Sequence, residues 1–65
     1  MKRVELLKII IEGFGCMLIR HGAKHDWYRN PNTGISQPVP RHREVKEHLA
    51  RRIIRMLGDD EGSGG

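Results

Sequence analysis

The start of the chain repeats apolar side chains three or four positions apart, the spacing that places them on one face of a helix. The apolar stripe consists of Val4, Leu7, Ile11 and Phe14, widened by Leu6 and Ile10. The pattern predicts an amphipathic helix that ends at Gly13 and Gly15, because glycine readily takes the left-handed conformation common at helix exits.

Two segments with strand character follow, separated by the bend Gly22-Ala23. Residues 16–21 are apolar for four positions and then polar, whereas residues 24–29 alternate side chains between two faces, as a strand does. A bend of two residues would pair position 18 with 27 and position 20 with 25. The sequence therefore predicts a hairpin that carries four side chains on one face: Leu18, Trp27, Arg20 and His25.

A second turn and two further elements complete the pattern. The stretch Asn30-Pro31-Asn32-Thr33-Gly34 consists of turn-forming residues, and Gly34 can take the positive φ that many turns require. Residues 35–39 read as a short strand whose prolines limit it to a sheet edge or to a strand that terminates. The helical period returns from residue 44 and ends at Gly58.

The order of these elements is helix, three antiparallel strands, helix. Since both helices must bury their apolar stripes against the same sheet, we expect an α+β fold with two helices on one face of a three-stranded antiparallel sheet. This is the α-β-β-β-α arrangement of double-stranded-RNA-binding domains. Residues 1–58 are expected to form one domain, and residues 59–65, which include no apolar side chain, a flexible acidic and Gly/Ser tail.

The composition is that of a soluble globular protein, with 37% hydrophobic and 31% charged residues in a chain of 65. No apolar run approaches the ~20 residues of a membrane-spanning helix, and no signal-peptide core is present. We therefore expect a cytoplasmic protein without membrane association. The single cysteine, Cys16, excludes an internal disulfide and lies in an apolar run that favours a core position over a nucleophile.

Positive charge is concentrated in the middle of the chain. Residues 20–55 hold nine Lys and Arg against three acids, together with all four histidines. Such a surface attracts polyanions, nucleic acid first, although a solvated basic face without a specific ligand is the alternative. No metal site is expected, because the histidines and Cys16 lack paired ligand spacing.

Five motifs, in this order, resemble those of the HicA family of bacterial toxins. An initial helix ending in glycine is followed by Gly-x-Lys-His, Arg-Asn-Pro-x-Thr-Gly and Pro-Val-Pro-Arg-His, and then by a closing helix of the Lys-Glu-x-Leu-Ala-Arg-x-Ile type. The similarity covers about residues 1–58. It implies a fold like that of double-stranded-RNA-binding domains and an mRNA interferase that cleaves RNA independently of the ribosome.

The resemblance also implies a HicB antitoxin that holds the toxin inactive, and a catalytic histidine shortly after the glycine of the first hairpin. In this sequence the glycine is Gly22 and the histidine is His25. Ala23 stands where family members usually carry Ser or Thr. An acidic antitoxin that covers His25 and the arginines would block the site and stabilise the folded chain.

RNA supplies its own nucleophile, the 2′-OH, so that cleavage needs a proton acceptor and donor and a partner for the phosphate charge. Histidine suits the proton step because its pKa of ~6.5 is close to neutrality, and arginine grips phosphate oxygens. We therefore expect His25 to act as general base or acid, without a metal or other cofactor. The expected RNA and phosphate contacts are Arg20, Lys24, Arg29, Arg41, His42 and Arg43.

Several alternatives remain open at the level of the sequence. His42 could be a second acid/base or part of a phosphate-gripping corner with its arginine neighbours, whereas His21 and His48 favour structural or solvated roles. Trp27 and Tyr28 offer one aromatic side chain for the core and one for base stacking. A non-catalytic RNA-binding module is the alternative to the toxin ribonuclease, and a domain that only docks another protein is the third possibility.

Overall fold

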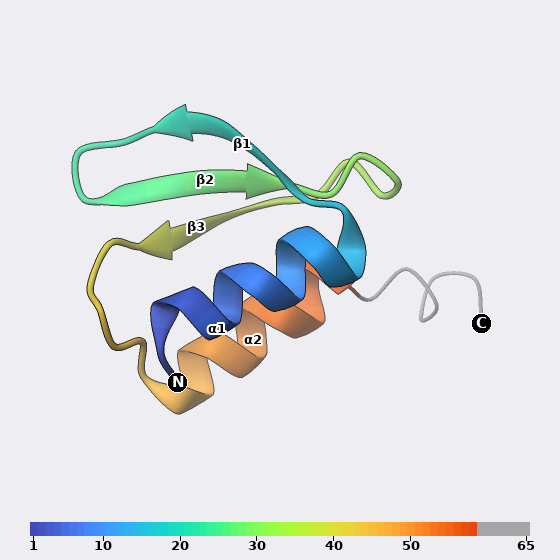
Figure 1. Ribbon diagram of the computed structural model, residues 1–65. Helices are drawn as coiled ribbons and strands as arrows, with labels where there is room; N and C mark the ends of the chain where they lie inside the picture. The colour runs from blue at the N-terminus through green and yellow to red at the C-terminus, as the bar shows by residue number, and fades with distance from the viewer. Residues whose placement is uncertain (59–65) are drawn as a thin grey trace.

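The structure, a computed structural model, describes residues 1–58 and has the predicted α-β-β-β-α order (Figure 1). The predicted tail, residues 59–65, lies outside the described residues. The elements are α1 (Arg3–Lys8), which continues into the π-helical segment η1 (Ile9–Gly13), then β1 (Met17–His21), β2 (His25–Arg29), β3 (Ser36–Pro40) and α2 (Glu47–Gly58).

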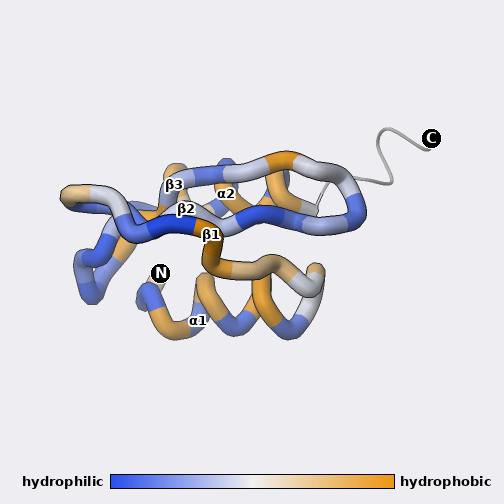
Figure 2. Tube along the Cα trace, turned by 90° about the horizontal axis from the view of Figure 1, so that it is seen from above, coloured by the Kyte–Doolittle hydropathy of each residue, from blue (hydrophilic) through white to orange (hydrophobic). Residues whose placement is uncertain are grey.

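The three strands form an antiparallel sheet in the order β1-β2-β3, and both helices lie on one side of it. Viewed from above the sheet, α2 lies beneath β2 and β3, whereas α1 lies on the side of β1 (Figure 2). Within residues 1–58, no helix covers the opposite face of the sheet. The predicted fold, an α+β arrangement like that of double-stranded-RNA-binding domains, is confirmed.

The core lies between the sheet and the two helices. Its buried side chains are Leu6, Ile10, Cys16, Tyr28, Val39, Val45, Ala50, Ile53 and Leu57. Tyr28, and not Trp27, faces the helices, which settles which aromatic side chain belongs to the core. Burial also raises the pKa of the Cys16 thiol, so this side chain is a core residue and a poor nucleophile at neutral pH.

The first helix is rotated relative to the stripe that the sequence suggested. Leu6 and Ile10, four residues apart, are fully buried, whereas Val4 is 70% and Ile11 42% exposed. The apolar residues of this helix cover so much of its circumference that the pattern alone does not fix which line faces the sheet. The exit is at Gly15, as predicted: Gly15 has φ 76°, and its N–H donates to the carbonyl of Ile11 at 3.0 Å. The prediction of a left-handed conformation at Gly13 is wrong, because Gly13 lies within η1 and does not have a positive φ.

The register of the β1–β2 hairpin differs from the prediction. Arg20 pairs with Trp27 and His21 with Asp26, so the pairs Arg20–His25 and Leu18–Trp27 are wrong. The bend is Ala23-Lys24, one residue later than expected, because the N–H of Gly22 donates to the carbonyl of His25 at 2.7 Å.

Two local features account for this register. A side chain at Gly22 would place its Cβ 2.9 Å from the carbonyl oxygen of His25, so that only glycine allows the strands to approach here. A bulge between Leu18 and Arg20 then shifts the pairing by one position along β1. Leu18 consequently pairs with Tyr28.

The second turn fastens the sheet to the end of α2. Asn30 is 2% exposed, and its side chain donates to the carbonyl of Leu57 at 2.7 Å and accepts from the N–H of Asn32 at 2.8 Å. Gly34 has φ 79°, as the turn pattern predicted. The third strand carries its prolines at the sheet edge, also as predicted.

Candidate nucleic-acid interface

The sheet face that the helices leave uncovered carries alternate residues of β2. His25 and Arg29 are exposed and Trp27 is half-buried on this outer face, whereas Asp26 and Tyr28 are buried on the helix side. The alternation follows from the period of two along a strand. The outer face therefore presents an imidazole, an indole and a guanidinium in one row.

Trp27 is held in place by its neighbours on β1. The guanidinium carbon of Arg20 lies 5.3 Å from the centroid of the Trp27 ring, the arrangement of a cation–π pair. Gly22 lies next to the indole as well, since a Cβ there would be in van der Waals contact with Nε1 at 3.6 Å. Arg20 and Trp27 thus form a positively charged, stacked platform next to the hairpin bend.

His25 is the first residue of β2 and pairs with Pro40 of β3. Its side chain is exposed, and within residues 1–58 it has no side-chain hydrogen-bond partner. Lys24, also exposed, precedes it in the bend. The ring nitrogens of His25 are therefore open to a ligand on the outer face.

Asp26 is the buried charge of the site and lies directly behind His25. It is 7% exposed and accepts three hydrogen bonds at 2.8 to 2.9 Å, from Arg3 Nη2, Arg41 Nε and His21 Nδ1. The Arg41 guanidinium, followed by the His21 ring, lowers the pKa of the Asp26 carboxyl to about 2. Asp26 is thus a carboxylate at neutral pH and attracts all three partners.

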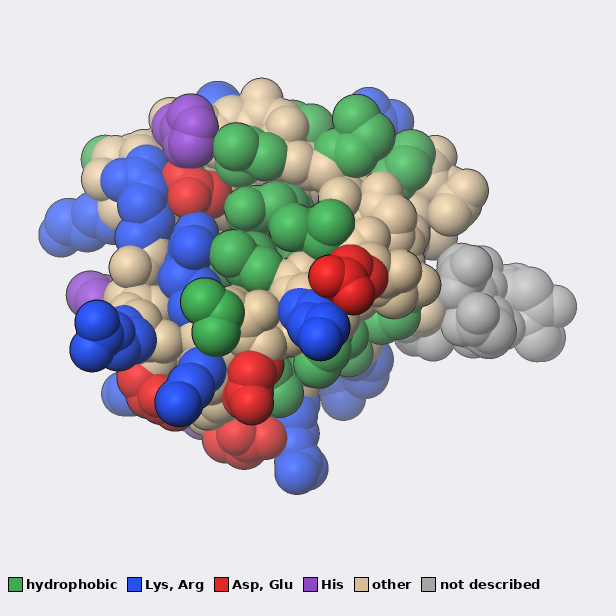
Figure 3. Space-filling view, viewed as in Figure 1, with side chains coloured by type: hydrophobic (Ala, Val, Ile, Leu, Met, Phe, Trp, Pro, Cys, Tyr) green, Lys and Arg blue, Asp and Glu red, His purple; other side chains and the backbone are tan. Residues whose placement is uncertain are grey.

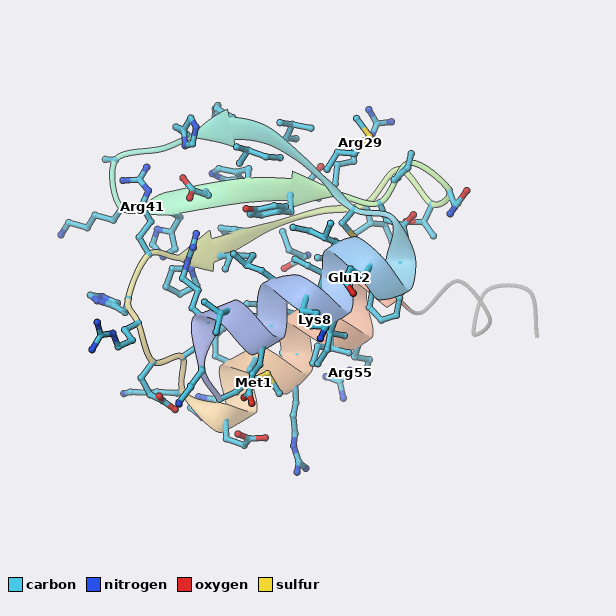
Figure 4. All side chains as sticks on the ribbon, in the orientation of Figure 1. Met1, Lys8, Glu12, Arg29, Arg41 and Arg55 are labelled. Carbon is cyan, nitrogen blue, oxygen red and sulfur yellow. The ribbon has the colours of Figure 1, made fainter. Side chains whose placement is uncertain are left out.

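Arg41 connects this carboxylate to the hairpin bend. Its guanidinium also donates to the backbone carbonyls of Gly22 and Ala23, and Figure 4 shows it beside the bend. Arg3, at the start of α1, donates in addition to the carbonyl of Pro40 at 2.7 Å. The bend that carries Lys24 and His25 is therefore fixed from the loop after β3, while Arg3 ties the first helix to β2 and β3.

The structure brings some of the predicted contact residues together and separates others. Arg20, Lys24 and His25 lie at one end of the hairpin, where Arg41 is also found. Arg29 lies at the opposite end of β2 from His25 (Figure 4). The two residues are four positions apart, which corresponds to about 13 Å along an extended strand. His42 and Arg43, both exposed, follow β3.

Sequence reasoning did not identify Asp26 and Arg3 as parts of this site. One signal was available: in the alternation of β2, Asp26 shares the face of Tyr28, and an acid on a buried face needs a cationic partner. Within residues 1–58, no three His, Cys, Asp or Glu side chains are grouped so that they could hold a metal ion. Over the same residues, no helix has the length and apolar character to cross a membrane.

The fold and this surface define a small α+β domain, like double-stranded-RNA-binding domains, with a basic, histidine-bearing sheet face. The family model described as HicA toxin of bacterial toxin-antitoxin matches residues 5–58, and the chain belongs to this family. It is accordingly a toxin of a toxin–antitoxin system. The comparison with curated proteins and the comparison with solved structures give no match.

Proposed function

We propose that this toxin is an mRNA interferase, a metal-independent endoribonuclease that acts on cytoplasmic mRNA and is held inactive by a HicB-type antitoxin. The observation that carries the proposal is the position of the His25 side chain in a chain that belongs to the HicA family. Its imidazole is exposed on the uncovered sheet face, next to Lys24 and the Arg20–Trp27 platform.

The proposed reaction moves one proton to His25 and breaks one P–O bond. The neutral imidazole takes the proton of the 2′-OH, and the 2′-oxygen attacks the adjacent phosphorus while the bond from phosphorus to the 5′-oxygen breaks. The 5′-oxygen leaves as a hydroxyl after it takes a proton from water or from His42. The products are a 2′,3′-cyclic phosphate and a 5′-hydroxyl end.

The surrounding cations supply the electrostatic part of the proposed reaction. In this proposal Lys24 and Arg20 balance charge on the scissile phosphate, and Arg29 binds a flanking phosphate. Arg41 and His42 border the same end of the sheet, with Arg43 next to them. The Arg20–Trp27 platform offers a stacking surface for one unpaired base, worth about 1–3 kcal/mol by analogy with other single-strand binders.

The decisive experiment incubates the purified chain with a defined single-stranded RNA in EDTA and identifies the product ends. We expect cleavage by the unaltered chain and a loss of about 10²- to 10⁴-fold in rate for His25→Ala. The matched control is His48→Ala, which removes an exposed histidine of α2 and should cleave RNA at an unchanged rate. Cleavage that requires an added metal ion would contradict the proposal.

One observation favours the second candidate, a non-catalytic RNA-binding module. Asp26 orients the ring of His21, whereas no carboxylate within residues 1–58 orients the ring of His25. Intact RNA with a folded chain that still binds RNA would favour the binding module. Loss of cleavage in His21→Ala, with His25→Ala unaffected, would instead move the acid/base role to the oriented pair.

A further inference from the structure

Among the residues that the structure describes, the strand β1 is an unpaired edge of the sheet. The other edge, β3, contains Pro38 and Pro40, which cannot donate backbone hydrogen bonds, and it packs against α2. All five residues of β1 are exposed, and β1 contains no proline. Of the two sheet edges formed by residues 1–58, β1 is therefore the one suited to pair with a further strand.

The first half of this edge is apolar. Met17, Leu18 and Ile19 are 58%, 42% and 50% exposed, and no charged side chain interrupts them. Ile11 of η1 is also exposed, and Figure 3 shows apolar side chains gathered between β1 and the first helix. Soluble proteins usually protect such an edge with charges, prolines, bulges or a covering segment. Here a bulge lies between Leu18 and Arg20, but the apolar side chains of residues 17–19 remain exposed, which is typical of an interface.

The backbone of the edge is available for pairing. The hydrogen bond from Gly22 N–H to His25 O marks these two residues as a bonded pair. Because bonded and non-bonded pairs alternate in an antiparallel ladder, the N–H of His21 points away from β2. The edge thus offers an outward backbone N–H at His21, on the hairpin side of the bulge between Leu18 and Arg20.

The charges next to the edge select the kind of partner. Arg20 and His21 occupy the second half of β1, and Met17 pairs with Arg29 on β2. A second copy of the chain, with a net charge of +4, would bring like charges together. An acidic strand would instead meet cations at both ends of the apolar segment.

We propose that the edge of β1 receives an extended acidic segment of the antitoxin, which adds a fourth strand to the sheet. A side chain of the added strand would enter the hollow lined by Met17, Ile19, Arg29 and Pro31, and its carboxylates would pair with Arg20 and Arg29. The added strand would inhibit the toxin because it occupies arginines that the proposed function assigns to RNA binding. Only this inhibitory consequence rests on the proposed function.

The test uses a synthetic peptide of about seven residues with alternating Glu and Val, capped at both ends, as the probe. Titration of the full isotope-labelled chain, followed by NMR, should shift amide signals of residues 16–22. A peptide of the same sequence with alternate backbone nitrogens methylated should bind about tenfold more weakly, because it cannot complete the ladder. Replacing its Glu by Gln should remove the salt dependence of binding.

Variants of the chain provide the matched control. Ile19→Lys places a charge on the edge and should weaken peptide binding about tenfold, whereas Met56→Lys makes the same change at an exposed position of α2 and should leave it unchanged. Thermal melts establish that both variants fold.

Four outcomes would overturn the proposal. They are amide shifts confined to the helices or β3, equal binding of the methylated peptide, self-association through β1 without peptide, and no binding at millimolar concentration. RNA cleavage is measured separately. Peptide binding without RNA cleavage would support this inference and contradict the proposed function. RNA cleavage without peptide binding would support the proposed function and contradict this inference.

Discussion

At the scale of single residues, Asp26 accepts hydrogen bonds from three side chains that belong to three different parts of the chain. One carboxylate on the helix side of β2 contacts side chains from the start of α1, the end of β1 and the loop after β3. Removing its charge would leave two guanidinium groups, those of Arg3 and Arg41, without their shared anion. Loss of one partner from such a cluster is costly because the remaining charges stay partly buried.

Asp26→Asn should therefore lower the melting temperature at neutral pH. The pKa of Asp26 falls from 3.8 to about 2 in the folded chain, so its stabilising effect is fully present above pH 3.8 and is lost as the pH falls through about 2. The unaltered chain should lose this share of its stability over that interval, and the variant should not. Circular-dichroism melts between pH 2 and 7 measure the difference.

The control for this prediction is Glu5→Gln, which removes an exposed carboxylate of α1 with no ion pair among the described residues. It should leave the melting temperature at neutral pH nearly unchanged. If the Asp26→Asn variant has the same melting temperature as the unaltered chain at pH 7, the charge of Asp26 contributes nothing to stability.

At the scale of elements, periodicity and turn chemistry were enough to place both helices, the three strands and the glycine at position 34. They were not enough to fix the register of the hairpin, because a bulge and the close approach at Gly22 leave no mark in an alternating pattern. The same limit applies to the site. His25 and Lys24 followed from a local motif, whereas Asp26 depends on cations that are far away in the sequence, Arg3 and Arg41.

The contact between the ends of the two helices gives the second prediction. Gly58 ends α2, and a Cβ there would lie 2.5 and 2.6 Å from ring carbons of Phe14. Helix propensity favours alanine over glycine by about 1 kcal/mol, but such an overlap costs about 1–3 kcal/mol. Gly58→Ala should therefore lower the free energy of unfolding, measured by urea denaturation.

Gly13 provides a matched control for Gly58 because it lies in η1 and a Cβ there would meet nothing within 4 Å. Gly13→Ala should stabilise the chain by up to about 1 kcal/mol. Phe14→Leu should reduce the cost of Gly58→Ala if the ring is the cause. Equal effects of the two glycine substitutions would contradict this account of the contact.

At the scale of the whole molecule, exposed arginines occur both on the sheet and on the helix layer. The outer sheet face carries Arg20 and Arg29, whereas α2 carries three exposed arginines, among them Arg55. Figure 4 shows Arg29 at the sheet and Arg55 on the helix layer. Net positive charge alone would attract RNA to either side, so it does not decide which layer binds. The proposed function requires the sheet face, where His25 lies.

The salt dependence of RNA binding separates the two layers. Each phosphate contact to single-stranded RNA contributes about 0.7 to the slope of log K against log salt concentration. Arg29→Gln should reduce that slope by about this amount, whereas Arg55→Gln, the same change on α2, should leave it intact. Fluorescence titrations of a cleavage-deficient His25→Ala background at several salt concentrations give both slopes. A reduced slope for Arg55→Gln alone would place RNA on the helices, away from His25, and would defeat the catalytic role proposed for it.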